Sequence, residues 1–200
     1  MGQSVDGVPI MMAYDIEAEE EKVEGSPYLY EDWKYFIIKR NNGAEFEAPY
    51  GNYHTYLNEL IVRLDGKFHR LHDSRQIEYF EVDSVRFVNL SFEGSDEVTF
   101  AEQLVDSDKI QVLKKYACII KRGKPSQGIV EATQDKYIRY EEYYVRSKTD
   151  ETKICELKVK KRGAKLKDDD VFPNLASFLK EHKKENFKDD DNLKRILSKF

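Results

Sequence analysis

Four histidines are the residues of this 200-residue chain best suited to acid–base or metal chemistry, and we expect them to be structural or surface residues. In the segment FHRLH, a spacing of three places His69 and His72 on opposite faces of a strand, the wrong arrangement for two ligands of one metal ion. The chain also lacks the G-x-S-x-G, H-E-x-x-H, glycine-rich phosphate-loop and EF-hand patterns. The sequence therefore predicts no catalytic, cofactor-binding or metal-binding residues and no enzyme activity. The other two histidines are His54 and His182.

The two cysteines, Cys118 and Cys155, each lie within an alternating run, and neither has a CxxC or Cys/His spacing. A free cysteine in such a run behaves as a small buried hydrophobic residue, which is the interpretation that we favour. A disulfide between them is the alternative that the sequence leaves open.

The tetrapeptide KDDD occurs at 167–170 and at 188–191, each time before an apolar stripe with helical spacing. Calcium loops need alternating oxygen ligands and a glycine at the bend, so we interpret these aspartates as N-terminal caps of two short helices. Pro173 fits the first turn of the first helix. The stripes are Leu175, Phe178, Leu179 and His182, and then Leu193, Ile196, Leu197 and Phe200.

Aromatic residues concentrate in two segments that could contact a partner, VEGSPYLYEDW at 23–33 and DKYIRYEEYYVRS at 135–147. In the second segment, strand alternation puts Tyr137 and Tyr143 on one face and the remaining tyrosines on the other. Tyrosine is favoured at protein interfaces but is also a common half-buried strand residue, so both interpretations stay open. The candidate contacts are Tyr28, Tyr30, Trp33, Tyr137, Tyr140 and Tyr144.

The segment KVKKRGAKLK, residues 158–167, holds six cations and no acid. Such a run can bind phosphate, lipid headgroups or an acidic partner. It is equally typical of an edge strand and turn that lysines protect against aggregation. The candidate contacts in this run are Lys158, Lys160, Lys161 and Arg162.

Charge is distributed unevenly along a chain whose formal net charge is −5. Residues 1–32 carry nine acids and one base, whereas residues 109–200 carry twenty-four bases and fifteen acids. This polarity suits the steering of a charged partner. The acidic first half and the negative total oppose phosphate backbones, so we expect no nucleic-acid partner.

Alternating strands and turn signals predict a mainly β protein: two antiparallel β-meander modules, as small sheets or barrels, followed by a C-terminal pair of short α-helices. LIVRL and KFHRL, around Asp65-Gly66, form the clearest hairpin and pair Arg63 with Phe68. Asn42-Gly43 predicts a type I′ turn with Arg40 opposite Glu45. We expect an acidic extended arm at 1–24, an N-terminal module at 25–92, a linker at 93–108, a second module at 109–167, and the helical pair packed on it at 168–200.

No apolar run reaches the roughly 20 residues of a membrane helix, so we expect no transmembrane segment. Met1-Gly2 precedes QSVDGVPIMMAYD, which is typical of a mature N-terminus behind an added start codon. We therefore expect an exported protein whose signal peptide has been removed.

The segments VEGSPYLYEDW, LKKYACIIKRGKPSQGIVEATQDKYIRYEEYYV and FLKEHKKENFKDDDNLKRIL give the chain a resemblance to a known group. Over about residues 23–200, it resembles a loose group of uncharacterised exported β-rich proteins of gram-negative bacteria. The group has no established activity, so the resemblance implies a cell-envelope location, a β-rich fold and no catalytic residues.

We expect a non-enzymatic accessory or binding protein of the cell envelope. It would be a subunit docked to a protein assembly in the periplasm or at the outer membrane, with peripheral membrane association as a further option. The alternative is a lipocalin-like carrier, in which a curled sheet encloses a small apolar ligand.

Overall fold

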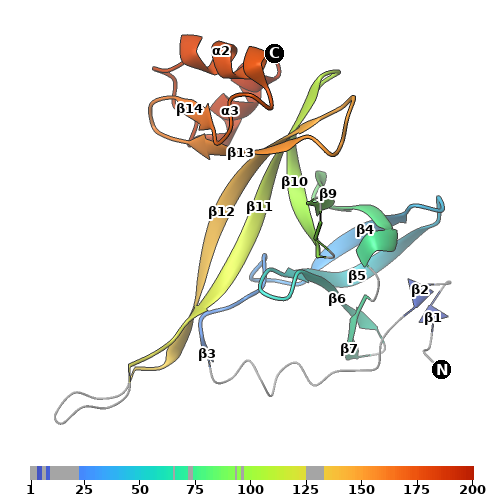
Figure 1. Ribbon diagram of the computed structural model, residues 1–200. Helices are drawn as coiled ribbons and strands as arrows, with labels where there is room; N and C mark the ends of the chain where they lie inside the picture. The colour runs from blue at the N-terminus through green and yellow to red at the C-terminus, as the bar shows by residue number, and fades with distance from the viewer. Residues whose placement is uncertain are drawn as a thin grey trace. The chain divides into compact units, whose positions relative to one another are not determined.

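A computed structural model of the chain shows a mainly β protein with two short helices near the C-terminus, which confirms the predicted fold class (Figure 1). The chain divides into two compact units that are both discontinuous in sequence. Unit 1 comprises Met1–Asn89 and Tyr116–Tyr140, and unit 2 comprises Leu90–Lys115 and Glu141–Phe200. The structure describes residues 4–5, 8–9, 23–64, 66–71, 74–92, 94–95, 97–124 and 133–200.

Unit 1 is built mainly from antiparallel hairpins, and in its strand at 34–40 the buried residues Phe36 and Ile38 alternate with more exposed neighbours, as a period-two pattern requires. Its core contains a stack of three phenylalanine rings: Phe80 lies 5.1 Å from Phe36 and 4.7 Å from Phe87, with the rings nearly parallel. Its strands are β1 (Ser4–Val5), β2 (Val8–Pro9), β3 (Val23–Glu24), β4 (Lys34–Arg40), β5 (Glu45–His54), β6 (Glu59–Leu64), β7 (Lys67–Arg70), β8 (Ile77–Val82), most of β9 (Val85–Ser91) and parts of β11 (Ile110–Lys121) and β12 (Asp135–Ser147), with a 3-10 turn η1 (Ser74–Gln76).

The first hairpin differs from the prediction by one position. Lys39, not Arg40, lies opposite Glu45, and their side chains form an ion pair at 3.6 Å. The turn has three residues between Arg40 and Ala44 and closes with Gly43 at φ +83°, so the type I′ prediction is wrong. A three-residue loop that ends in a left-handed glycine is the next commonest hairpin connection. The second hairpin pairs Arg63 with Phe68, as predicted.

Unit 2 combines strands with both helices around one apolar cluster. Leu157 and Leu166 from the strands and Leu175, Leu193 and Ile196 from the helices are almost fully buried in it. The elements of unit 2 are β10 (Val98–Asp106), the remaining parts of β9, β11 and β12, β13 (Ile154–Val159), β14 (Ala164–Leu166), α2 (Pro173–Glu181) and α3 (Asp190–Leu197).

The segment 93–108, which we expected to be a linker, contains strand β10. Phe100 and Leu104 of this strand are buried, and a bulge between Gln103 and Val105 interrupts its pairing with β11. The polar residues at the start of the segment are typical of a turn, but the following VTFAEQLV is apolar enough to be buried.

The larger strands are hydrogen-bonded in the order β14-β13-β12-β11-β10-β9-β8-β4-β5-β6-β7. Most of the predicted arm lies outside the described residues. Two of its described pieces, β1 and β2, pair with each other, and β3 pairs in parallel with β12 through Val23 and Asp135. Within the described part of the chain, no helix has the length and apolar character needed to cross a membrane.

The two KDDD runs have different roles. Asp189 caps α3, because its carboxylate accepts a hydrogen bond from the Asn192 N–H at 2.8 Å. Helix α2 instead begins with Phe172 as N-cap, which makes no side-chain cap, and with Pro173 in its first turn. Asp168 accepts the Asp170 N–H in a turn before that helix, so the first run does not cap it.

Candidate functional site

The aromatic candidates of residues 23–33 belong to half-buried clusters in unit 1. The Tyr28 ring lies 5.5 Å from Trp33, and Trp33 stacks on Phe68 at 4.8 Å. Tyr30 lies edge-on to Phe36 at 6.4 Å. Because all three candidates are half-buried against other rings, they contribute more to packing than to an open aromatic surface.

The candidates of residues 135–147 are divided between the units. Tyr137 contacts Tyr56 at 6.1 Å in unit 1, where Tyr140 is 41% exposed. Tyr144 belongs to unit 2, where its ring packs on Phe92 and its hydroxyl donates to Glu142 at 3.1 Å. Of these three tyrosines, Tyr140 has the most exposed side chain.

One histidine, His54, and both cysteines are buried, whereas His69 and His182 are half-buried. His54 accepts the Leu57 N–H on Nδ1 at 3.1 Å and is almost inaccessible. Cys118 and Cys155 are both buried free thiols, and burial raises the pKa of Cys118. Among the described residues, no group of three or more His, Cys, Asp or Glu side chains is arranged to hold a metal ion.

The predicted basic run forms the hairpin of β13 and β14. Its register pairs Lys158 with Lys165 and Leu157 with Leu166. Since the leucines are buried in the core of unit 2, the two lysines lie together on the outer face. Like charges directly opposite each other destabilise a sheet by a few tenths of a kcal/mol or more. The outer face of this hairpin therefore carries concentrated positive charge.

A second basic segment, residues 183–188, docks on the turn of this hairpin. The Gly163 N–H donates to the Glu185 carbonyl at 2.8 Å, and the Phe187 N–H donates to the Lys160 carbonyl at 3.1 Å. Phe187 is fully buried in the core and anchors the segment. As a result, lysines that are far apart in sequence share one surface.

Gly163 is required where these two segments meet. Its φ is +81°, and a Cβ placed on it would lie 3.2 Å from the Cα and carbonyl oxygen of Lys183. Gly43 has a similar φ of +83° but nothing within 4 Å. We expect Gly163→Ala to lower the free energy of unfolding by roughly 2 kcal/mol, and Gly43→Ala by about 1 kcal/mol from backbone strain alone. Urea unfolding of both variants measures the difference, and equal losses would contradict the close contact at Gly163.

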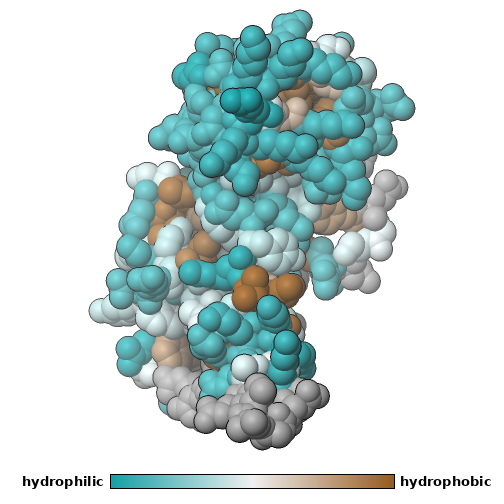
Figure 2. Space-filling model, turned by 90° about the vertical axis from the view of Figure 1, so that its left-hand side faces the viewer, coloured by the Kyte–Doolittle hydropathy of each residue, from teal (hydrophilic) through white to brown (hydrophobic). Residues whose placement is uncertain are grey.

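We call the resulting set of exposed cations the basic surface. None of its members forms an ion pair with another residue in the described part of the chain. Figure 2 shows that hydrophilic side chains dominate the drawn face around the C-terminal helices. The basic surface consists of Lys158, Lys160, Lys161, Arg162, Lys165, Lys183, Lys184 and Lys188.

A charged cluster lies inside unit 2. The Lys114 ammonium, whose side chain is only 8% exposed, contacts Glu141 Oε1 at 2.9 Å and Asp190 Oδ2 at 2.8 Å. The Tyr143 hydroxyl donates to Asp190 Oδ1 at 3.0 Å and lies 3.2 Å from Glu141 Oε2. The cluster therefore ties β11 and β12 to the first turn of α3.

Burial and charge both shape the ionisation of this cluster. Desolvation disfavours the Lys114 cation, but the hydrogen bonds and charges of Asp190 and Glu141 outweigh it and raise the pKa of Lys114 above its usual 10.5. Desolvation and the same two carboxylates raise the pKa of Tyr143. Lys114 is thus held as a cation and Tyr143 as a neutral hydrogen-bond donor.

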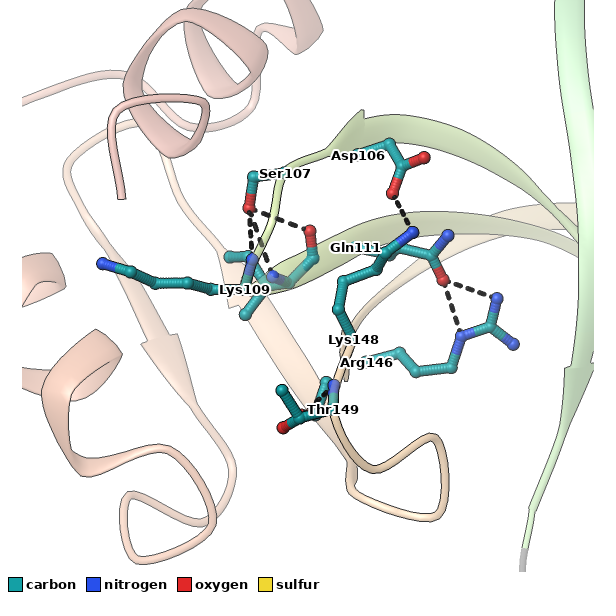
Figure 3. A network of polar contacts seen from close by, with 9 residues as sticks. Asp106, Ser107, Lys109, Gln111, Arg146, Lys148 and Thr149 are labelled. Carbon is teal, nitrogen blue, oxygen red and sulfur yellow. Dashed lines mark hydrogen bonds and ion pairs between the residues drawn. The ribbon is translucent and has the colours of Figure 1, made fainter.

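A second polar network fixes the far end of β12 (Figure 3). Arg146 Nε and Nη2 donate to Gln111 Oε1 at 2.9 and 2.6 Å, and the two side chains point toward each other. Lys148 Nζ donates to Asp106 Oδ1 at 2.8 Å. These contacts hold β12 against β10 and β11 where it begins to pair with β13.

The basic run predicted from the sequence, 158–167, contains five of the eight residues of the basic surface, and the sequence patterns missed the other three. Lys183 and Lys184 lie between two predicted helices, and only the docking of their backbone on the turn at 160–163 brings them to the basic run. Lys188 was part of a predicted capping run. The Lys114 cluster joins three segments of the chain, so no local pattern reveals it.

Comparisons with models of protein families, with curated protein sequences and with solved structures found no match to this chain.

Proposed function

We propose that the protein is a non-enzymatic binding protein, and that its basic surface docks an acidic region of a partner protein. The observation that carries this proposal is the pair of hydrogen bonds that brings residues 183–188 onto the turn at 160–163. They gather eight exposed cations, including two lysines directly opposite each other, without compensating ion pairs in the described part of the chain. A partner with several carboxylates would relieve this repulsion and gain affinity from it.

The protection of a sheet edge accounts for only part of the basic surface. Strand β14 is an edge strand, so Lys165 fits that role. Lys183, Lys184 and Lys188 do not lie on a strand, yet they extend the same positive field. We therefore favour binding over edge protection.

A protein partner fits better than a membrane or a nucleic acid. All exposed large hydrophobic side chains among the described residues, such as Tyr50 and Ile119, belong to unit 1, so unit 2 offers none for insertion beside its basic surface. The net charge of −5 disfavours a long phosphate backbone. The sequence resemblance to exported β-rich proteins supports the cell envelope as the location of this partner and an accessory subunit as the role.

The test uses an acidic probe, a fluorescent peptide of alternating glutamate and threonine, in anisotropy titrations at low and physiological salt. We expect Lys160→Glu/Lys161→Glu/Lys184→Glu to weaken binding by at least thirtyfold, because three attractions become repulsions. The control, Lys67→Glu/Lys121→Glu/Lys124→Glu, makes the same charge change on exposed lysines of unit 1 and should stay within threefold of the unmodified protein. Equal weakening in both variants, or no salt dependence, would refute docking at the basic surface.

A further inference from the structure

Strands β12 and β13 pair over only three positions and then part. Their ladder joins Arg146 to Ile154, Val145 to Cys155 and Tyr144 to Glu156. Beyond the last pair, residues 141–143 of β12 and 157–159 of β13 line a cavity of about 430 Å³, which Lys188 also borders. This volume lies within the range of ligand-binding pockets. The cavity is therefore a wedge between two strands of one sheet, and we call it the β12–β13 wedge.

The Lys114 cluster fixes side chains on the β12 side of the wedge. Glu141 and Tyr143, which lie on the β12 side of the wedge, are held toward α3 by Lys114 and Asp190. On the other side, β13 continues its pairing with β14 through Leu157–Leu166 and its neighbours. On the sides away from the wedge, β12 pairs with β11 and β13 pairs with β14. Beyond Tyr144, the edges of β12 and β13 that face each other, their inner edges, line the wedge. Inner strand edges of this kind are templates for an added strand.

The charges around the wedge favour an acidic occupant. Three glutamates line the wedge, and each forms an ion pair with a lysine: Glu141 with Lys114 at 2.9 Å, Glu142 with Lys115 at 3.6 Å and Glu156 with Lys167 at 3.4 Å. The two lining lysines form no ion pair within the described part of the chain, and both belong to the basic surface. They are Lys158 and Lys188.

We propose that an extended acidic segment of the partner protein enters the β12–β13 wedge as an added strand. Its backbone would hydrogen-bond to the inner edges at 141–143 and 157–159, a span of three positions or about 10 Å of strand. Its carboxylates would lie on Lys158 and Lys188. This inference rests on the proposed function, because the basic surface supplies the attraction that brings the segment to the wedge.

The test compares two probes of equal charge, the glutamate–threonine peptide and the same peptide with alternate backbone amides N-methylated. N-methylation removes the donors that a strand needs and leaves the carboxylates unchanged. We expect the methylated probe to bind at least tenfold more weakly. In hydrogen exchange of the complete protein, the plain probe should slow exchange at least tenfold for amides within 141–143 and 157–159, while amides of β10 serve as the internal control.

The outcomes separate the two proposals. If both probes bind equally, with salt dependence, and protection is confined to 160–163 and 183–188, the wedge proposal is wrong and the basic surface remains the docking site. If neither probe binds in a salt-dependent way, the proposed function itself fails. If the plain probe binds more tightly and protects both inner edges, strand addition is supported.

Discussion

Phe80→Ala should lower the free energy of unfolding by about 4 kcal/mol, the largest effect that we expect from any single side chain in unit 1. Phe80 is fully buried and is the middle ring of the stack formed with Phe36 and Phe87. Its truncation removes both ring contacts and leaves a cavity between rings from two neighbouring strands, β4 and β9, which cannot close without shifting the sheet. Denaturant unfolding followed by circular dichroism measures the loss.

Tyr35→Ala is the matched control for this prediction. Tyr35 is also an aromatic residue of unit 1, but its side chain is 46% exposed, so its removal leaves no buried cavity and should cost less than about 1 kcal/mol. If the two variants lose the same stability, the phenylalanine stack is not the centre of a packed core.

Lys114→Met should lower the free energy of unfolding by roughly 2–3 kcal/mol, because it leaves two carboxylates facing each other without their cation. We expect a smaller loss of stability than for a fully buried ion pair, because the Glu141 and Asp190 side chains are 48% and 30% exposed and can be partly hydrated. Lys115→Met is the control. Its ion pair with Glu142 is looser, at 3.6 Å, and its loss should cost less than about 1 kcal/mol.

The Lys114 prediction has a pH signature. The pKa of Lys114 is raised in the folded protein, so its contribution is complete below the ordinary value of 10.5 and is lost as the pH rises through the raised value. The stability difference between the unmodified protein and Lys114→Met should therefore be constant from neutral pH to about pH 10 and shrink above it. A difference that grows with pH in this range would contradict the assignment. A double-mutant cycle with Asp190→Asn isolates the pair itself.

Local patterns predicted the strands and hairpins well because alternation and turn residues act over a few positions. The Asp65-Gly66 hairpin has the predicted register, whereas Asn42-Gly43 does not: the chain uses Asn41 as a third loop residue and moves Glu45 opposite Lys39. In the first hairpin, the Asn41 N–H donates to the Gln76 carbonyl at 2.9 Å, next to β8, which pairs with the other side of β4. Tertiary pairing of this kind is not encoded in the turn.

The candidate site was predictable only where it is contiguous. The basic run at 158–167 stands out in composition, and the structure places it on one hairpin. Its extension by 183–188 depends on Gly163 and Phe187, whose roles appear only when the segments meet. For aromatic candidates such as Trp33, the sequence leaves packing and binding both open, because an aromatic-rich segment suits either, and the structure shows the ring stacked on Phe68.

The division of the chain has a consequence for how the protein is made. Unit 2 interrupts unit 1, since residues 90–115 separate its first part from residues 116–140. On a ribosome, the early hairpins emerge long before the strand segments that complete their unit, and β11 and β12 each contribute to both units. Cutting the gene at any single point leaves at least one unit incomplete. A gene fragment therefore cannot encode both units intact, and the two units would be lost or transferred together.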